Sequence, residues 1–303
     1  MKITICINTF NRNKNLFNLL KSIEKIYLLN CHVVKILIID NTINNNSYSF
    51  IQKFKLNYKF EITHINEKKN GIVYSRNKCL KYLKTTSQDY ICLFDDDCTI
   101  DKFWLKHAIN TVKIYKAKIV SGPQIHYKKN NLINLNHKFI YQKFFEKNYA
   151  DKVKKIKWAA TNNVFIKYNV LKKNNLHFDI NLNQFKIGED QLFFSMLNKN
   201  KNLIYWNKKV IVYEKIHENR TGIKWLVNRS FKLGVLGHYI DMKLHGKFFG
   251  LLLNYLKSIY YLLKSIFFLM LMYNKIYIIN SANNLARFYG RTIGIFIFKR
   301  IKF

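Results

Sequence analysis

The chain has 303 residues, of which 49% are hydrophobic, and it carries 52 Lys and Arg against 17 Asp and Glu, a formal net charge of +35. The hydrophobic content excludes a generally disordered chain, and the length suits one large domain or two modest ones. Because the basic residues are spread along the chain rather than gathered in one tail, we expect no nucleic-acid partner and favour nucleotide diphosphates and acidic lipid headgroups.

The first half alternates between apolar strand-like runs and helical patterns. Strands are expected at residues 3–7, 33–39, 60–66, 90–94 and 118–121, and helices at 14–29, 72–85 and 102–116. This alternation predicts a mainly parallel α/β sheet with flanking helices. The amino terminus enters a strand at once and lacks the charged segment and apolar core of a secretory signal, so we expect this part of the chain on the cytoplasmic side.

The middle of the chain, residues 124–157, is polar and rich in Asn and Lys, and no element is assigned to it. Order is expected again at residues 158–166, in a helix that Gly188-Glu189-Asp190 opens and that continues to Leu197, and in short strands at 203–206 and 210–216. The five cysteines contain no Cys-x-x-Cys pair and several lie in apolar runs. This pattern favours buried free thiols in a reducing compartment.

Beyond Gly222 the chain has 13 Lys and Arg and one acid, Asp241, and helices are expected at 224–244, 247–273 and 275–298. The second of these is strongly apolar, but Lys257 and Lys264 interrupt it on one face. A lysine near the centre of a bilayer costs about 2.5–3.5 kcal/mol, so we favour a helix that lies in the interface with its lysines at the headgroups. The alternative is a helical hairpin packed on the preceding domain.

Three consecutive acids, Asp95-Asp96-Asp97, close the apolar run of residues 90–94. Ligands of open α/β sheets bind at the carboxyl edge of the strands, and carboxylates at the first and third positions can hold a divalent cation that carries phosphates. The alternative is that Asp97 or Asp101 caps the next helix.

Several segments at strand ends, taken in order, resemble the family 2 glycosyltransferases with the GT-A fold, over about residues 3–235. The matching segments are Ile7 to Arg12, Asp40-Asn41-Thr42, Gly71 to Asn77, Asp95-Asp96-Asp97 for the DxD signature, and Gly188-Glu189-Asp190. Glu214 through Arg220, with Trp225-Leu226 and Arg229-Ser230-Phe231, is similar to a tail of bacterial members that build surface polysaccharides. The sequence departs from the family at Asn8 and His217, where Pro is usual, and at Asn41-Thr42, which lacks the usual Gly.

The resemblance implies a Rossmann-like GT-A catalytic domain at residues 1–222. From the charge and the lysine face of the apolar helix, we expect residues 223–303 to form a basic, apolar helical region that associates with the cytoplasmic face of the cell membrane, peripherally or monotopically. The resemblance further implies transfer of a sugar, with inversion, from a nucleotide-diphosphate sugar such as a UDP-sugar to a glycan or polyprenyl-linked acceptor. Such an enzyme would serve cell-surface polysaccharide or lipopolysaccharide synthesis.

The resemblance also implies a role for each motif residue. Nucleotide-binding residues would be Thr9, Asn11, Arg12, Asp40, Arg76, Asn77 and Asp96. Asp95 and Asp97 would hold Mn2+ or Mg2+, with His217 as a further metal or phosphate ligand. Asp190 would be the catalytic base, and Glu189 would position the acceptor or share that role.

Two rival functions remain open from the sequence. A nucleotidyltransferase or sugar-nucleotide pyrophosphorylase also uses strand-end acids and a metal, but the Gly-rich amino-terminal loop expected there is absent. A non-enzymatic basic protein that binds lipid or nucleic acid would carry its acids only for structure, whereas here the acids gather at strand ends.

Overall fold

The computed structural model describes residues 1–28, 32–127, 140, 153–199, 204–215, 220, 222–271 and 273–299. The chain divides into two compact units. The first unit comprises Met1–Tyr127 with Asn148–Lys215, and the second unit comprises Lys128–Lys147 with Ile216–Phe303. Each is described by itself.

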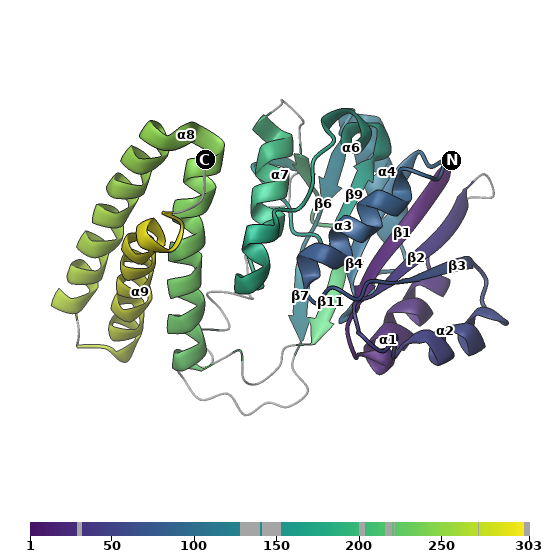
Figure 1. The fold of residues 1–303 in the computed structure, drawn as a ribbon, viewed down its shortest axis with the longest axis horizontal. Helices are drawn as coiled ribbons and strands as arrows, with labels where there is room; N and C mark the ends of the chain where they lie inside the picture. Colours follow the sequence, from purple (N-terminus) through teal and green to yellow (C-terminus); the bar gives the residue numbers. More distant parts are fainter. Residues whose placement is uncertain are drawn as a thin grey trace. The chain divides into compact units, whose positions relative to one another are not determined.

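An eight-stranded sheet runs through the first unit in the order β3-β2-β1-β4-β9-β6-β10-β8 (Figure 1). Its strands are β1 (Lys2–Thr9), β2 (Val33–Asp40), β3 (Glu61–Asn66), β4 (Tyr90–Asp95), β6 (Ile119–Ser121), β8 (Lys154–Ile156), β9 (Val164–Lys167) and β10 (Ile204–Trp206). Strands β3, β2, β1 and β4 are parallel neighbours, as are β6 and β10, whereas β9 is antiparallel to β4 and β6 and β8 to β10. The expected mainly parallel sheet is therefore confirmed.

Helices cover both faces of this sheet, which explains why its central strands read as apolar runs. On one face Ile3, Ile5 and Ile7 of β1 belong to a core shared with α1 (Asn13–Glu24), α2 (Tyr48–Lys55) and α4 (Trp104–Tyr115). On the other face Cys6 belongs to a core shared with α3 (Ile72–Leu83), α6 (Tyr168–Asn174) and α7 (Glu189–Lys199). A 3-10 helix, η1 (Ile180–Phe185), precedes α7. Cys6, Cys79, Cys92 and Cys98 are buried free thiols, as expected, and Cys31 lies outside the described residues.

A small three-stranded sheet was not expected as a whole. In it β11 (Val212–Lys215) is antiparallel to β5 (Cys98–Ile100) and parallel to β7 (Gln124–Tyr127). Within residues 158–166, where order is expected, β9 begins at Val164, and Asn163 before it uses its side chain to join neighbouring segments. It accepts from Trp104 Nε1 at 2.7 Å and donates to the carbonyls of Pro123 at 3.0 Å and Val210 at 2.8 Å.

The second unit consists mainly of α8 (Ile223–Met270) and α9 (Lys275–Ile297). Gly246 breaks α8 with φ 78° and ψ 176°, and the chain reverses direction there (Figure 1). The reversal brings Lys257 Nζ to 2.7 Å from Asp241 Oδ1, atoms that a straight helix would hold about 24 Å apart. The three expected helical segments are thus confirmed. None of the helices in the described ranges is long and apolar enough to cross a membrane.

Gly71, at the start of α3, occupies a position that only glycine fits. Its φ is +134°, and a Cβ built there would lie 1.9 Å from Oδ1 of Asn183. We predict that Gly71→Ala lowers the free energy of unfolding by about 1–3 kcal/mol, as a strained backbone does. Urea unfolding measures this loss, and Gly222→Ala is the control because its φ is −85° and no atom lies within 4 Å.

Adding Asn183→Ala to Gly71→Ala should recover the steric part of the loss and leave the backbone part. Equal stability of the Gly71→Ala and Gly222→Ala proteins would contradict the prediction.

Candidate active site

The loop after β1 and the acidic turn after β4 lie side by side, because β1 and β4 are parallel neighbours with Asn8 opposite Asp95. The buried carboxylate of Asp96 joins them. Its Oδ2 accepts from Thr9 Oγ1 at 2.8 Å and from the Phe10 N–H at 3.3 Å, and its Oδ1 accepts from Arg12 Nη1 at 3.1 Å. Burial raises the pKa of Asp96 to about 6 against the opposing effects of Arg12 and Thr9. Asp96 therefore fixes the shape of the loop at residues 9–12.

Asp95 and Asp97 each meet one arginine and keep a second carboxylate oxygen to which no described residue donates. Arg12 Nη1 lies 2.9 Å from Asp97 Oδ2, and Arg76 Nη2 lies 3.3 Å from Asp95 Oδ1. Burial raises the pKa of Asp95, and Asp97 adds to the rise while Arg76 opposes it. Two neighbouring hard oxygen donors whose charges repel fit Mg2+ or Mn2+, which take few protein carboxylates and fill the remaining positions with water and phosphate.

Within the ranges that the structure describes, no three His, Cys, Asp or Glu side chains form a complete protein-built metal site. His217 lies outside the described residues, so its role as a further ligand stays a prediction. The Asp95 and Asp97 pair is the candidate donor set, which a bound phosphate ligand would complete.

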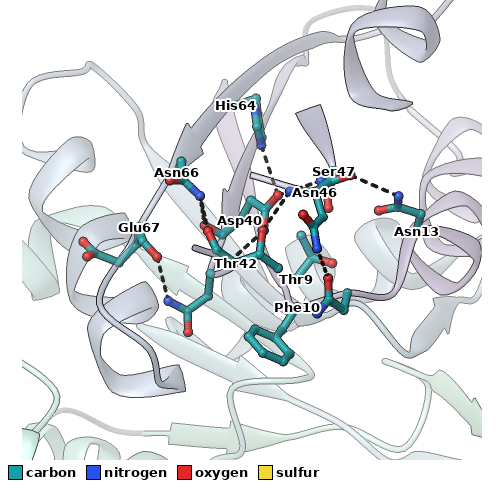
Figure 2. Close-up of polar contacts among 12 residues, drawn as sticks. Thr9, Phe10, Asn13, Asp40, Thr42, Asn46, Ser47, His64, Asn66 and Glu67 are labelled. Atoms are coloured by element: carbon teal, nitrogen blue, oxygen red, sulfur yellow. Dashed lines mark hydrogen bonds and ion pairs between the residues drawn. The ribbon is translucent and has the colours of Figure 1, made fainter. Parts of the chain in front are cut away.

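Asp40, at the end of β2, is fully buried and organises the loop that follows it (Figure 2). Its Oδ1 accepts from the N–H of Thr42 at 3.0 Å and from Thr42 Oγ1 at 2.8 Å, and its Oδ2 accepts from the Ser47 N–H at 2.8 Å. His64 Nε2 lies 3.9 Å from Oδ2, and burial lowers the pKa of His64 despite that charge. The Asp40 carboxylate therefore stabilises the loop that follows β2. Its contact with the nucleotide base stays a prediction.

Asparagine amides connect the loops that follow β1, β2 and β3. Asn46 Nδ2 donates to Asn11 Oδ1 at 2.6 Å, and Asn66 Nδ2 donates to the carbonyls of Asp40 and Thr42 (Figure 2). Asn41 Nδ2 donates to the carbonyls of residues 67 and 69. The sequence analysis missed Asn46 and Asn66, and the only signal was the position of Asn66 at the end of an expected strand.

A second cluster surrounds Arg76 of α3. Its guanidinium forms a buried ion pair with Glu189 and also meets Asp95, and it lies 5.6 Å from the ring of Phe178. Asp190 follows Glu189 at the start of α7, and burial together with the charge of Glu189 raises its pKa to about 7. Arg76 therefore links Asp95 of the acidic turn to Glu189 at the start of α7.

Asn77, the neighbour of Arg76, has a different environment. Its Nδ2 donates to the carbonyl of Phe178 and its Oδ1 accepts from the Phe178 N–H, each at 2.8 Å. Both ends of the amide thus hold the backbone that leads to η1. The structure does not bring Asn77 into either cluster, and its placement near ribose and diphosphate stays a prediction.

We predict that Arg76→Met lowers the free energy of unfolding by about 3–5 kcal/mol, because it leaves Glu189 as a buried unpaired charge. The double variant Arg76→Met with Glu189→Met should recover most of that loss, since it removes both charges. Urea unfolding of the single and double variants measures the coupling. A double variant less stable than Arg76→Met would contradict the interpretation that this pair exists as a unit.

Comparisons with known proteins agree with this geometry. A family model described as "Glycosyl transferase family 2" matches residues 4–175. The succinoglycan biosynthesis protein ExoM of Rhizobium meliloti (strain 1021) is 23% identical over 216 residues, which are 70% of this chain and 67% of ExoM.

The fold is similar to that of two solved structures. One is S. aureus TarS 1-349 in complex with UDP-GlcNAc, with a TM-score of 0.56, 18% identity and coverage of 80% of this chain and 66% of that chain. The other is mannosyltransferase PcManGT from Pyrobaculum calidifontis in complex with GDP-Man and Mn2+, with a TM-score of 0.58, 11% identity and coverage of 99% and 76%. The chain thus spans just under two thirds of the TarS fragment. Because the family model matches more than half of the chain, the protein belongs to glycosyl transferase family 2 and is a glycosyltransferase with the GT-A fold.

Proposed function

We propose that the protein transfers a sugar, with inversion, from a UDP-sugar to a glycan or polyprenyl-linked acceptor during synthesis of a cell-surface polysaccharide. The name of ExoM supports the process, and the complex of TarS with UDP-GlcNAc supports the donor class. The observation that carries the proposal is the pair of ion pairs by which Arg76 joins Asp95 of the acidic turn to Glu189, the neighbour of Asp190. It supports one site that handles both a diphosphate and an acceptor hydroxyl.

On the donor side, the loops after β1 and β2 form the nucleotide site, with Thr9, Asn11 and Arg12 in the first loop and Asp40 shaping the second. Asp95 and Asp97 would hold Mn2+ or Mg2+, whose positive charge would offset the charge that develops on the leaving diphosphate. Asp96 keeps the first loop against the acidic turn.

On the acceptor side, Asp190 takes the proton of the attacking hydroxyl. A pKa of about 7 leaves much of this carboxylate ionised at neutral pH and makes it a matched base. The acceptor oxygen then bonds to the anomeric carbon as the bond to the diphosphate breaks on the opposite side, which inverts the centre. Glu189 is neutralised by Arg76, so its part is to position Arg76 and the start of α7 rather than to accept the proton.

We propose residues 1–222 as the catalytic domain and 223–303 as a region that associates with the cytoplasmic face of the cell membrane. The division of the structure after Lys215 supports the boundary. The ratio of 13 basic residues to one acid beyond Gly222 supports an anionic membrane surface as the partner.

We predict that Asp97→Asn weakens Mn2+-dependent UDP binding at least about tenfold, because it removes one of two anionic donors to the cation. Titration calorimetry with UDP, with and without Mn2+, measures the change. Asp101→Asn is the matched control, since Asp101 Oδ1 accepts from the Phe103 N–H at 2.8 Å, next to the start of α4. Unchanged Mn2+-dependent binding by the Asp97→Asn protein would contradict the metal assignment.

We predict that Asp190→Asn retains UDP binding but lowers the transfer rate by about 10²–10⁴-fold, the usual contribution of a general base. The raised pKa of Asp190 also sets the pH profile, because only the ionised carboxylate accepts a proton. In the wild type kcat/KM should be constant above pH 7 and fall about tenfold per unit below it. Steady-state kinetics from pH 5 to 9 measure both effects, and normal turnover by the Asp190→Asn enzyme would remove Asp190 from the mechanism.

A further inference from the structure

In the part of α8 after Gly246 the buried side chains are small or polar and most of the exposed ones are apolar, which is the reverse of a helix that packs in water. Its fully buried positions are all small or polar, namely Gly250, Asn254, Ser258 and Ser265. Apart from Lys247, its exposed positions are large and apolar, and they include Phe248, Phe249, Leu252, Tyr255, Leu256, Leu263, Ile266, Phe267 and Met270. Phe248 and Met270, near the two ends of this segment, are 75% and 80% exposed. A water-soluble amphipathic helix buries its apolar face instead.

The helix α9 shows the same reversal. Its buried positions are mostly small or polar: Ser281, Asn283, Asn284, Ala286, Gly290, Arg291 and Gly294. Its exposed positions include Ile276, Ile278, Leu285, Tyr289, Ile295, Phe296 and Ile297. A Cβ built on Gly290 would lie 2.1 Å from the Phe231 carbonyl, so α9 and α8 approach backbone to backbone. Small residues at such contacts are typical of helices that pack within lipid.

Several polar groups between these helices pair with one another. Arg291 Nη1 lies 3.0 Å from Asp241 Oδ2 and 2.9 Å from Asn254 Oδ1, and Lys257 Nζ lies 2.7 Å from Asp241 Oδ1. Lys257 is expected at the headgroups. In the structure its ammonium pairs with the buried carboxylate of Asp241, while its side chain stays 44% exposed. Ionisable residues that face the bundle interior and pair there are also typical of lipid-embedded helices.

We propose that the second unit inserts the apolar side chains of α9 and of α8 after Gly246 into the acyl-chain region of one leaflet of an anionic bilayer. The inference deepens the proposed membrane association by replacing headgroup contact with insertion. Lipid fits this surface better than a second copy of the chain, because the region carries 13 basic residues and one buried acid, so two copies would repel. Because exposed apolar residues occur along the whole helix, we expect the full length of the helix, and not only one of its ends, to contact the acyl chains.

The experiment compares full-length variants by flotation with phosphatidylcholine vesicles containing phosphatidylglycerol, in 0.1 M and 1 M NaCl. The test variant is Leu256→Glu with Leu263→Glu, at side chains 53% and 60% exposed. The control is Ile43→Glu with Leu56→Glu, at first-unit side chains 69% and 83% exposed. We expect the wild type and the control to float at both salt concentrations and the test variant to float at least tenfold less. Thermal unfolding by circular dichroism confirms that both variants fold.

A second measurement reports on depth. Leu256→Trp should gain fluorescence that brominated acyl chains quench, and Leu56→Trp should gain fluorescence that they do not quench.

Three outcomes would overturn insertion. Release of the wild type by 1 M NaCl would show headgroup contact alone and leave the proposed association standing. Failure to float, with a dimer that light scattering detects and Leu256→Glu with Leu263→Glu dissociates, would show that a second copy covers this face. Equal flotation of the test variant and the control would show that these side chains do not contact lipid. Donor hydrolysis without vesicles is measured separately, and its absence would count against the proposed catalytic function and not against insertion.

Discussion

Carboxylates gather at one edge of the sheet, and two arginines make that arrangement possible. Arg12 meets Asp96 and Asp97, and Arg76 meets Asp95 and Glu189. Like charges this close repel strongly where water is scarce, and a guanidinium stays charged at any pH that the fold tolerates. The arginines therefore hold the carboxylates in place before any ligand arrives. They do not saturate Asp95 and Asp97, whose remaining oxygens are available to a cation.

Much of the first unit could be predicted from sequence because its strands are buried on both faces or end in polar motifs. The alternation of Ile3, Ile5 and Ile7 predicts β1, and the run that Asp95 closes predicts β4. The three-residue strand β5 could not be predicted, since so short a segment has no detectable period. The pairing of Arg76 with Glu189 joins residues 113 positions apart and depends on how α3 and α7 lie against the sheet.

The hydrogen bonds that connect the loops around Asp40 could not be predicted from the sequence for another reason. Asparagine is common throughout this chain, so the residues that connect the loops, such as Asn46 and Asn66, do not stand out by composition. Their function depends on which carbonyl each amide reaches, and that is a property of the assembled strand ends. Similarly, the apolar content of the second unit predicts helices but does not say which face is inside. Only the contacts of Asn254 and Arg291 show that the polar face is the inner one.

The side chain of Asn163 has a consequence for how this enzyme can change. With one acceptor and two donors it joins Trp104 at the start of α4, Pro123 before β7 and Val210 before β11, so one side chain fixes three segments that are distant in sequence. No other side chain of that size offers the same three bonds. A substitution at Asn163 would therefore loosen α4 and the approaches to β7 and β11 at once, which leaves this position little freedom to vary.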